Sequence, residues 1–316
     1  MKQTTFASLA LERKKRQTRQ ERFLAEMDPV VQWAALLAII EPYYPTTGRC
    51  GRPSMPLSTM LPIYFMQRWY ALSDPAMEEA LYEVESTRRF AGMDLTDDGM
   101  PDKTTILKFR HLLEQHALTG QMMNIINDTL EQRGPLLKGG TMDDTTIIHA
   151  PRSTKKQGKQ RDLKMHETKK GKQWCVAMKG HVGADVNSGR VHTVSVTPAN
   201  ASDISQFSHF VREDDGQMFG DKGYVQANPK RKARKAGLFW GVSLQAIRQH
   251  QLAEATKRFN HKISSIRARV AHVFRVIKRQ FDCTKVRYKG IAKNGAQVFT
   301  LIGLSNLYPA RRALMS

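Results

Sequence analysis

The chain has 316 residues, of which 41% are apolar, 25% charged and 8% aromatic, a composition that excludes a wholly disordered or collagen-like chain. Lys and Arg outnumber Asp and Glu by 50 to 29, and the net charge of +21 indicates an anionic polymer or surface as partner. No run approaches the roughly 18 to 20 consecutive apolar residues of a membrane-spanning helix, and the first residues lack the apolar segment of a signal peptide. We therefore expect a cytoplasmic protein with no membrane partner.

The positive charge is concentrated in the C-terminal part. Residues 140–316 hold 33 of the 50 Lys and Arg side chains but only 12 of the 29 Asp and Glu side chains. The first part is neutral overall, yet residues 1–22 carry seven basic groups against two acidic ones and are predicted to form a basic arm. A charge run alone often only makes a surface soluble. An asymmetry over half a chain favours nucleic acid, because clustered Lys and Arg neutralise phosphates and release counterions.

Residues 45–133 are expected to form a helical region. Apolar residues recur at helical spacing from Leu57 onward. An Asp-Pro pair at Asp74 is typical of the start of a second helix, and Asp102 is the expected cap of a third. A fourth helix follows up to residue 133. Such short helices suit a helix-turn-helix-like DNA-binding module, and equally a plain helical bundle.

A Gly- and Pro-containing segment at 133–140 marks the expected start of a second domain, residues 140–310. Three strand-like runs follow, the first two separated by a Lys-rich connection at 152–173 and the last two joined by a turn that predicts a hairpin. Next come a helix, a short buried strand, another strand and a long basic helix from about residue 252 to 281. This order predicts a mixed α/β sheet flanked by helices.

Aspartates inside apolar strands require an explanation, because an unpaired buried carboxylate is costly. Asp144 lies in the run TMDDTTII, and Asp221 ends the run MFGD. Since strand side chains alternate between faces, Asp143 and Asp144 point oppositely and only one of them can join a given site. The two carboxylates could serve as a turn cap and a salt bridge. Together they also match two-metal phosphoryl transfer, in which carboxylates hold Mg²⁺ or Mn²⁺.

Five segments carry a longer signature: GTMDDTTIIHAP (140–151), HETKKGKQWCVAMKGHVGAD (166–185), SGRVHTVSVTPANASD (188–203), FGDKGY (219–224) and IRARVAHVFRVIKRQFDCTKVRYKG (266–290). They closely resemble transposases of the IS5 family of bacterial insertion sequences. The resemblance extends into the helical part and so covers most of the chain. It implies an RNase H-like DDE catalytic domain preceded by a mainly α-helical DNA-binding region.

The resemblance also implies partners and cofactors. The partners are double-stranded DNA, as terminal inverted repeats and target, and a second copy of the chain, because two element ends must be brought together. In the family, two aspartates and one glutamate hold two Mg²⁺ or Mn²⁺ ions. The implied location is the bacterial cytoplasm, in association with the nucleoid.

Carried over position by position, the catalytic and metal-binding aspartates of the family fall on Asp144 and Asp221. The third acid belongs to a helical signature, R-x3-E-x6-K, in which Arg267 and Lys278 stand at the correct spacing. The glutamate position is occupied by Ala271. A methyl group cannot coordinate a metal, so we expect the fold and DNA affinity to survive and the cleavage chemistry to be strongly impaired.

Five residues are the expected DNA contacts. Arg267 and Lys278, about three helical turns apart, would bind phosphate near the scissile bond. Lys169, Lys170 and Trp174 match the family's H-x-T-K-K-G-x-Q-W run, and cations beside an indole suit backbone contact plus stacking on an unpaired base. The competing interpretation of Trp174 is a core residue, the commoner place for a tryptophan in a strand.

Three functions follow as alternatives. The first is an IS5-type transposase that cuts and joins DNA at the ends of its element. The second is a catalytically inactive, transposase-derived DNA-binding protein or repressor, which Ala271 favours. The third is a generic RNase H-like nuclease, which the helical region and basic arm make weaker because they imply recognition of a specific site.

Overall fold

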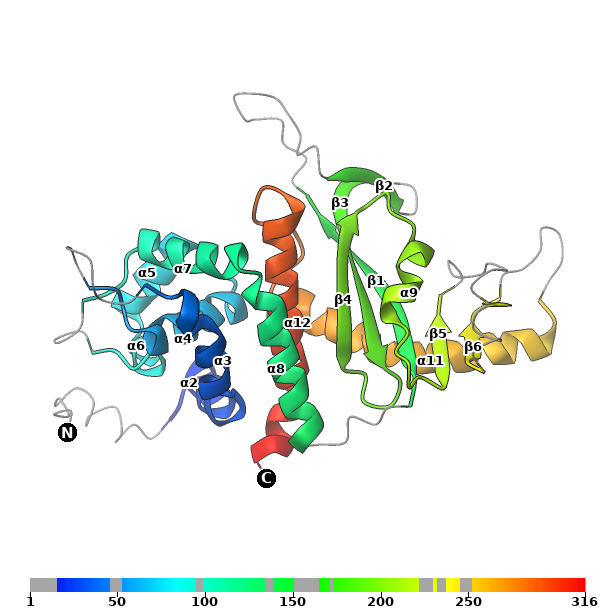
Figure 1. The fold of residues 1–316 in the computed structure, drawn as a ribbon, viewed down its shortest axis with the longest axis horizontal. Helices are drawn as coiled ribbons and strands as arrows, with labels where there is room; N and C mark the ends of the chain where they lie inside the picture. The colour runs from blue at the N-terminus through cyan, green and yellow to red at the C-terminus, as the bar shows by residue number, and fades with distance from the viewer. Residues whose placement is uncertain are drawn as a thin grey trace.

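The computed structural model describes residues 16–45, 53–94, 99–133, 139–150, 165–170, 173–221, 230–231, 237–244 and 252–315. A helical N-terminal part precedes a mixed, open β-sheet with helices on both faces (Figure 1), which confirms the predicted RNase H-like fold class. Among the described residues no single helix is long and apolar enough to span a membrane. One pair, Arg19–Val30 with Trp33–Tyr43, passes by length and composition together, but it is bent by 74°.

The helical part is more extensive than the sequence indicated. It contains α2 (Arg19–Met27), α3 (Trp33–Ile40), α4 (Leu57–Trp69), α5 (Asp74–Glu83), α6 (Glu85–Phe90), α7 (Lys103–Gln115) and α8 (Leu118–Arg133), with the 3-10 turns η1 (Asp28–Val30) and η2 (Glu41–Tyr43). Asp102 caps α7 by accepting from the backbone N–H of Thr105, as predicted. Helix α5 is capped by Ser73 instead of Asp74. The predicted basic arm ends in α2, and residues 1–15 lie outside the described residues.

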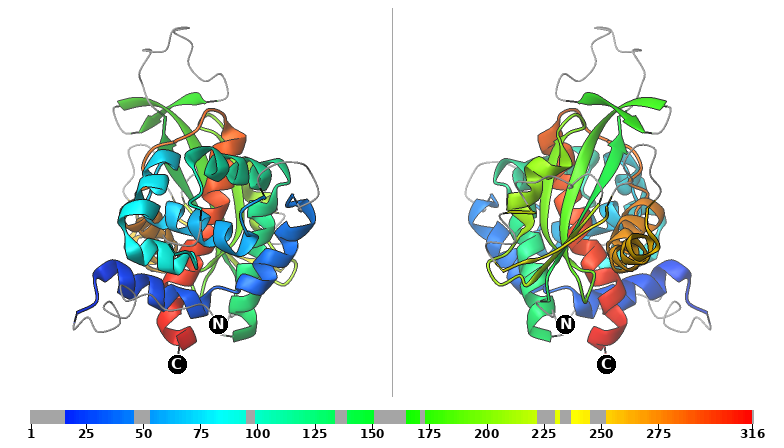
Figure 2. Two further views of the ribbon diagram at one scale, coloured as in Figure 1. Left: turned by 90° about the vertical axis from the view of Figure 1, so that its left-hand side faces the viewer. Right: turned by 90° about the vertical axis from the view of Figure 1, so that its right-hand side faces the viewer.

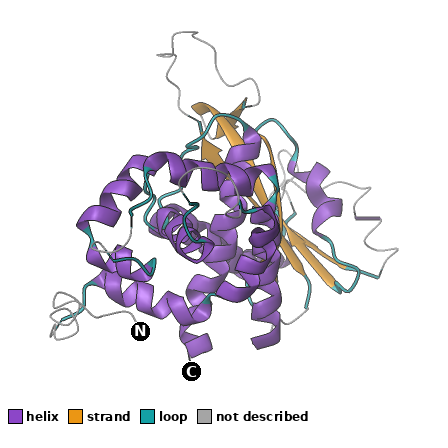
Figure 3. Ribbon diagram, turned by 60° about the vertical axis from the view of Figure 1, so that its left-hand side comes forward, coloured by secondary structure: helices purple, strands orange, loops and turns teal. Residues whose placement is uncertain are grey.

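Helix α4 is the centre of this bundle, since every residue from Thr59 to Trp69 is buried. The other helices of the part surround it (Figure 3). Even Arg68 is only 2% exposed. Because α4 is buried on all sides, it shows no single apolar stripe, and its polar side chains Gln67 and Arg68 are hydrogen-bonded inside the bundle.

The sheet consists of β1 (Thr141–His149), β2 (His166–Lys170), β3 (Gln173–Asp185), β4 (Val191–Pro198), β5 (Gln217–Gly220) and β6 (Phe239–Val242). Strand β3 is antiparallel to β1, β2 and β4, whereas β5 is parallel to both β1 and β6. The predicted β3–β4 hairpin is confirmed. The segment 152–173 was predicted to be a connection without a strand. This prediction was wrong at β2, whose backbone pairs with the first residues of β3.

Helices cover the sheet from two sides (Figure 2). The short η3 (Asp203–Gln206) and α9 (Phe207–Phe210) lie on one face, where Phe210 packs against Gly183 of β3. On the other face lie α11 (Glu254–Arg275), which continues as the π-helical turn η5 (Val276–Gln280), and α12 (Ile291–Met315). The predicted long basic helix is therefore confirmed, and α12 was not anticipated.

Helix α12 joins the helical part to the sheet. It runs alongside α8, and Gly303 allows close approach to Met123 and Ile126 (Figure 1). Its buried Asn306 accepts from the backbone N–H of Val191 at 3.0 Å and donates to the carbonyl of the same residue at 2.8 Å. These bonds satisfy the backbone at the start of β4, so the two parts share one continuous core.

The loop after η5 forms a second connection. The Tyr288 hydroxyl accepts a 2.8 Å hydrogen bond from Arg68 of α4. The Arg110 guanidinium of α7 lies 4.1 Å from the centre of the Tyr288 ring and pairs with Asp74 at 2.9 Å. Buried cations are tolerated when carboxylates and aromatic faces compensate them. This arrangement fixes the C-terminal end of the long basic helix to the bundle.

Candidate active site

Strands β1 and β5 bring the two predicted aspartates together. The strands are parallel, and the register pairs Met142 with Phe219. Two residues further along each strand are Asp144 and Asp221, so they lie level at the point where β5 ends. Asp144 faces α11, whereas Asp143 is fully buried opposite Gly183, on the face that α9 covers. The predicted alternation therefore places only Asp144 at the site.

Arg267 of α11 contacts both carboxylates. Its Nη2 donates to Asp144 Oδ1 at 2.9 Å, and its Nη1 lies 3.4 Å from Asp221 Oδ1. The Arg267 and Asp144 side chains are 16% and 24% exposed, and that of Asp221 is 58% exposed. Burial raises the pKa of the Asp144 carboxyl, and the neighbouring Arg267 guanidinium opposes this rise. The resulting cluster holds two carboxylates around one guanidinium.

Ala271 lies on α11 four residues after Arg267 and is exposed. Residues four apart on a helix share a face, so a longer side chain at this position would project beside Arg267. Lys278 follows in η5, and its Nζ donates to the Ile147 carbonyl of β1 at 3.4 Å. The helical signature therefore runs along β1, next to the aspartate pair.

The residues present do not form a complete site for two divalent ions. Two carboxylates converge, but a guanidinium bridges them, and Ala271, where the sequence resemblance led us to expect the third acid, carries only a methyl group. Within the described part of the chain, no three His, Cys, Asp or Glu side chains are grouped so that they could hold a metal ion. Among the described residues, the predicted Mg²⁺ or Mn²⁺ site therefore has two carboxylates and no third acidic ligand beside them.

The predicted stacking residue Trp174 is 60% exposed, which contradicts its interpretation as a core residue. The reason is its place at the start of β3. Strand β1 pairs with β3 from Ala177 onward, so Trp174 lies beyond the end of β1. In the strand register, Trp174 is opposite Lys169 of β2. Lys170 also lies on β2. The side chains of Lys169 and Lys170 are outside the described residues.

The sheet face under η3 holds a polar network that was not predicted from the sequence. His181 Nε2 is 2.7 Å from Thr197 Oγ1, and its Nδ1 is 3.0 Å from Thr145 Oγ1. The Asp203 carboxylate, at the start of η3, accepts from Lys179 Nζ at 2.9 Å. Burial lowers the pKa of His181 to about 4. Part of this network could have been predicted from the sequence, because Lys179 and His181 are two residues apart on a strand and therefore lie on the same face of it.

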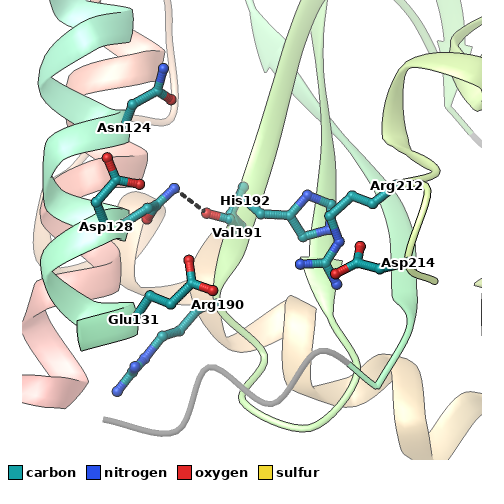
Figure 4. Close-up of a pocket in the computed structure, with 9 residues that line it drawn as sticks. Asn124, Asp128, Glu131, Arg190, Val191, His192, Arg212 and Asp214 are labelled. Atoms are coloured by element: carbon teal, nitrogen blue, oxygen red, sulfur yellow. Dashed lines mark hydrogen bonds between the residues drawn. The ribbon is translucent and has the colours of Figure 1, made fainter. Parts of the chain in front are cut away.

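A separate polar cleft of about 230 Å³ lies between α8 and the start of β4 (Figure 4). Asp128 and Glu131 contribute acidic groups, and Arg190 and Arg212 contribute basic ones. Because both signs of charge surround it, the cleft favours neither an anionic nor a cationic ligand. It belongs to the junction between the helical part and the sheet.

Two family models match the chain. A model described as Transposase domain (DUF772) matches residues 11–112, and one described as Transposase DDE domain matches residues 138–307, more than half of the chain. The chain therefore belongs to the DDE transposases, a class of transposase and nuclease-type enzymes that generally use divalent metals. Together the two matches indicate the IS4/IS5-like kind. No solved structure matches the chain.

Proposed function

We propose that the chain is a transposase of the IS5 family that binds the terminal inverted repeats of its element and target DNA, with strand cleavage and transfer strongly impaired. The observation that carries this proposal is the aspartate pair, Asp144 and Asp221, beside a helix that presents Ala271 at the place of the third acid. In this proposal residues 1–22 form a basic arm, 45–133 the DNA-binding region and 140–310 the catalytic domain.

No other acid on the same helix can take the place of the missing one. Glu254 begins α11, is 75% exposed and pairs with Lys257 at 2.8 Å. At a rise of 1.5 Å per residue it lies about 25 Å along the helix from position 271. Asp282 follows η5 in a left-handed backbone conformation, φ 46°, which ends the helix. The catalytic set that we propose for the described residues is therefore Asp144 and Asp221.

The proposed DNA contacts lie in two places. Lys278 and Arg267 lie on the helical signature, and Lys169, Lys170 and the exposed Trp174 lie at the far end of the β2–β3 pair. The cations would bind phosphates without reading sequence, and the indole would stack on an unpaired base. A homodimer would bring two element ends together.

The test uses a labelled duplex that carries the terminal repeat flanking the coding sequence. DNA binding and cleavage in Mg²⁺ or Mn²⁺ are measured in parallel for the wild type, Ala271→Glu and Ala271→Glu/Asp144→Asn. We expect all three to bind, and only Ala271→Glu to cut. Equal cutting by the wild type and Ala271→Glu would show that another carboxylate supplies the third ligand.

The second candidate is a repressor, a DNA-binding protein that blocks active copies. It is favoured by the bridged aspartate pair, since a centre neutralised by Arg267 can be retained for stability alone. In a reporter assay with an active relative, the wild type would then reduce transposition in proportion to its occupancy of the repeat. An unchanged transposition frequency at saturating occupancy argues against this role.

A further inference from the structure

The space between Asp144 and Asp221 already contains a positive charge. One guanidinium nitrogen of Arg267 lies 2.9 Å from Asp144 and the other 3.4 Å from Asp221. A Mg²⁺ ion bound by both carboxylates would need its oxygen ligands at about 2.0–2.1 Å. The guanidinium and such an ion would compete for the same carboxylate oxygens.

We propose that Arg267 is the resident cation of this centre, taking the place of a divalent metal and excluding it. The inference rests on the proposed assignment of Asp144 and Asp221 to the family's carboxylates. With Ala271 in place of an acid, the pair has a formal charge of −2, and one guanidinium neutralises half of it. A third carboxylate, which would favour a divalent ion over Arg267, is missing.

The setting of Arg267 supports this role. Its side chain is only 16% exposed, and its Nε is buried with no hydrogen-bond partner among the described residues. Both terminal nitrogens are directed to carboxylates, so binding a DNA phosphate through them would require breaking an existing ion pair. A partly buried guanidinium between two acids is screened less than a surface pair, and it ties α11 to both β1 and the end of β5.

The site therefore needs no metal ion to fold or to hold its two carboxylates together. Removing the guanidinium while leaving both carboxylates creates like-charge repulsion, which a divalent ion can relieve. The Arg267→Gln variant should therefore be less stable than the wild type in EDTA, and its stability should be restored by Mn²⁺.

The experiment measures thermal unfolding in EDTA and in millimolar Mn²⁺, and counts bound Mn²⁺ from the EPR signal of the free ion. The proteins are the full-length wild type, Arg267→Gln, Arg267→Lys and Arg275→Gln. Arg275 is the matched control, because it lies on the same helix, is exposed and makes no ion pair with any residue that the structure describes. Arg267→Lys keeps the charge but cannot bridge two carboxylates with a planar fork.

We expect the wild type and Arg275→Gln to bind no Mn²⁺ and to show the same Tm in both conditions. Arg267→Gln should bind Mn²⁺ stoichiometrically, and its Tm should rise by several degrees in Mn²⁺, because an ion that binds only the folded state stabilises it. Arg267→Lys should fall between the two.

Two results would overturn the inference. The first is stoichiometric Mn²⁺ binding by the wild type with a rise in its Tm, a measurement that needs no variant and so stands even if Arg267→Gln fails to fold. The second is a folded Arg267→Gln protein that still binds no Mn²⁺, because the missing acid alone would then explain the absence of metal. Both results concern metal binding and stability, and the proposed function is tested separately by the binding and cleavage assay with Ala271→Glu.

Discussion

Protonation of His181 should make the protein acid-sensitive. The side chain is fully buried, and each ring nitrogen faces a threonine hydroxyl, that of Thr145 or that of Thr197. Burial lowers its pKa from 6.5 to about 4; the Asp203 carboxylate opposes this shift and the Lys179 ammonium adds to it. The folded protein therefore keeps the ring neutral at pH values at which the unfolded chain has already bound a proton.

The sign and size of the effect follow from this difference. Because the unfolded state binds more protons between pH 6.5 and about 4, stability is complete above pH 6.5 and is lost as the pH falls through that window. Integration of the two titration curves gives a loss of about 2 kcal/mol in the free energy of unfolding between pH 7 and pH 5. His192, whose pKa burial also lowers to about 4, adds a loss of the same sign.

The assay is denaturant unfolding at pH 7 and pH 5 for the wild type and His181→Gln, whose amide can still hydrogen-bond but does not titrate. The variant should lose about 2 kcal/mol less than the wild type over this interval. His209→Gln, which removes an exposed histidine of α9, serves as the control. An identical pH dependence in His181→Gln and the wild type would refute the reasoning, because the buried ring would then not be the group that binds the proton.

Three further changes test other parts of the structure. Tyr288→Phe removes the acceptor of a buried Arg68 donor and should lower the free energy of unfolding by about 1–3 kcal/mol, measured by denaturant titration; a neutral effect would mean that water replaces the hydroxyl. Asn306→Ala leaves the backbone N–H of Val191 without its hydrogen-bond partner, whereas the Val191 carbonyl still accepts from Asn127, and should cost about 1–3 kcal/mol in the same assay, unless β4 shifts to compensate. Trp174→Ala should leave Tm unchanged, because the side chain is 60% exposed, and should weaken binding to gapped duplex by about 1–3 kcal/mol in fluorescence anisotropy; unchanged binding argues against stacking.

The sheet and the long basic helix could be predicted because their signals are local. Alternation of β-branched residues identified the first strand, and its two adjacent aspartates had to face opposite sides. The structure places Asp144 on β1 and Asp221 directly after the parallel neighbouring strand β5. Asp102 likewise signalled the start of α7 from its own side chain.

Helices α3 and α12 escaped prediction for opposite reasons. The sequence of α3, WAALLAII, is apolar throughout and has no polar face to give it a period. Helix α12 contains buried polar residues such as Thr300 and Asn306, whose partners include Tyr64 and Asn127 of distant segments. These residues interrupt the apolar stripe on which a sequence-based assignment depends.

The bridge made by Arg267 could not be predicted, because it joins residues 123 positions apart in the chain. The family resemblance identified Arg267 as part of a helical signature, and its charge suggested phosphate as its partner. Only the packing of α11 against β1 shows that its two terminal nitrogens meet Asp144 and Asp221.

The position of α12 also determines the order in which the protein can be completed on the ribosome. Chains emerge N-terminus first, yet Met123 and Ile126 of α8 are covered by a helix that begins only at Ile291. The apolar surface of α8 that α12 covers is therefore shielded from water only after the entire sheet has been translated. A copy of the gene truncated by a stop codon or frameshift before α12 would release a product with this surface exposed, a substrate for proteases and a seed for aggregation.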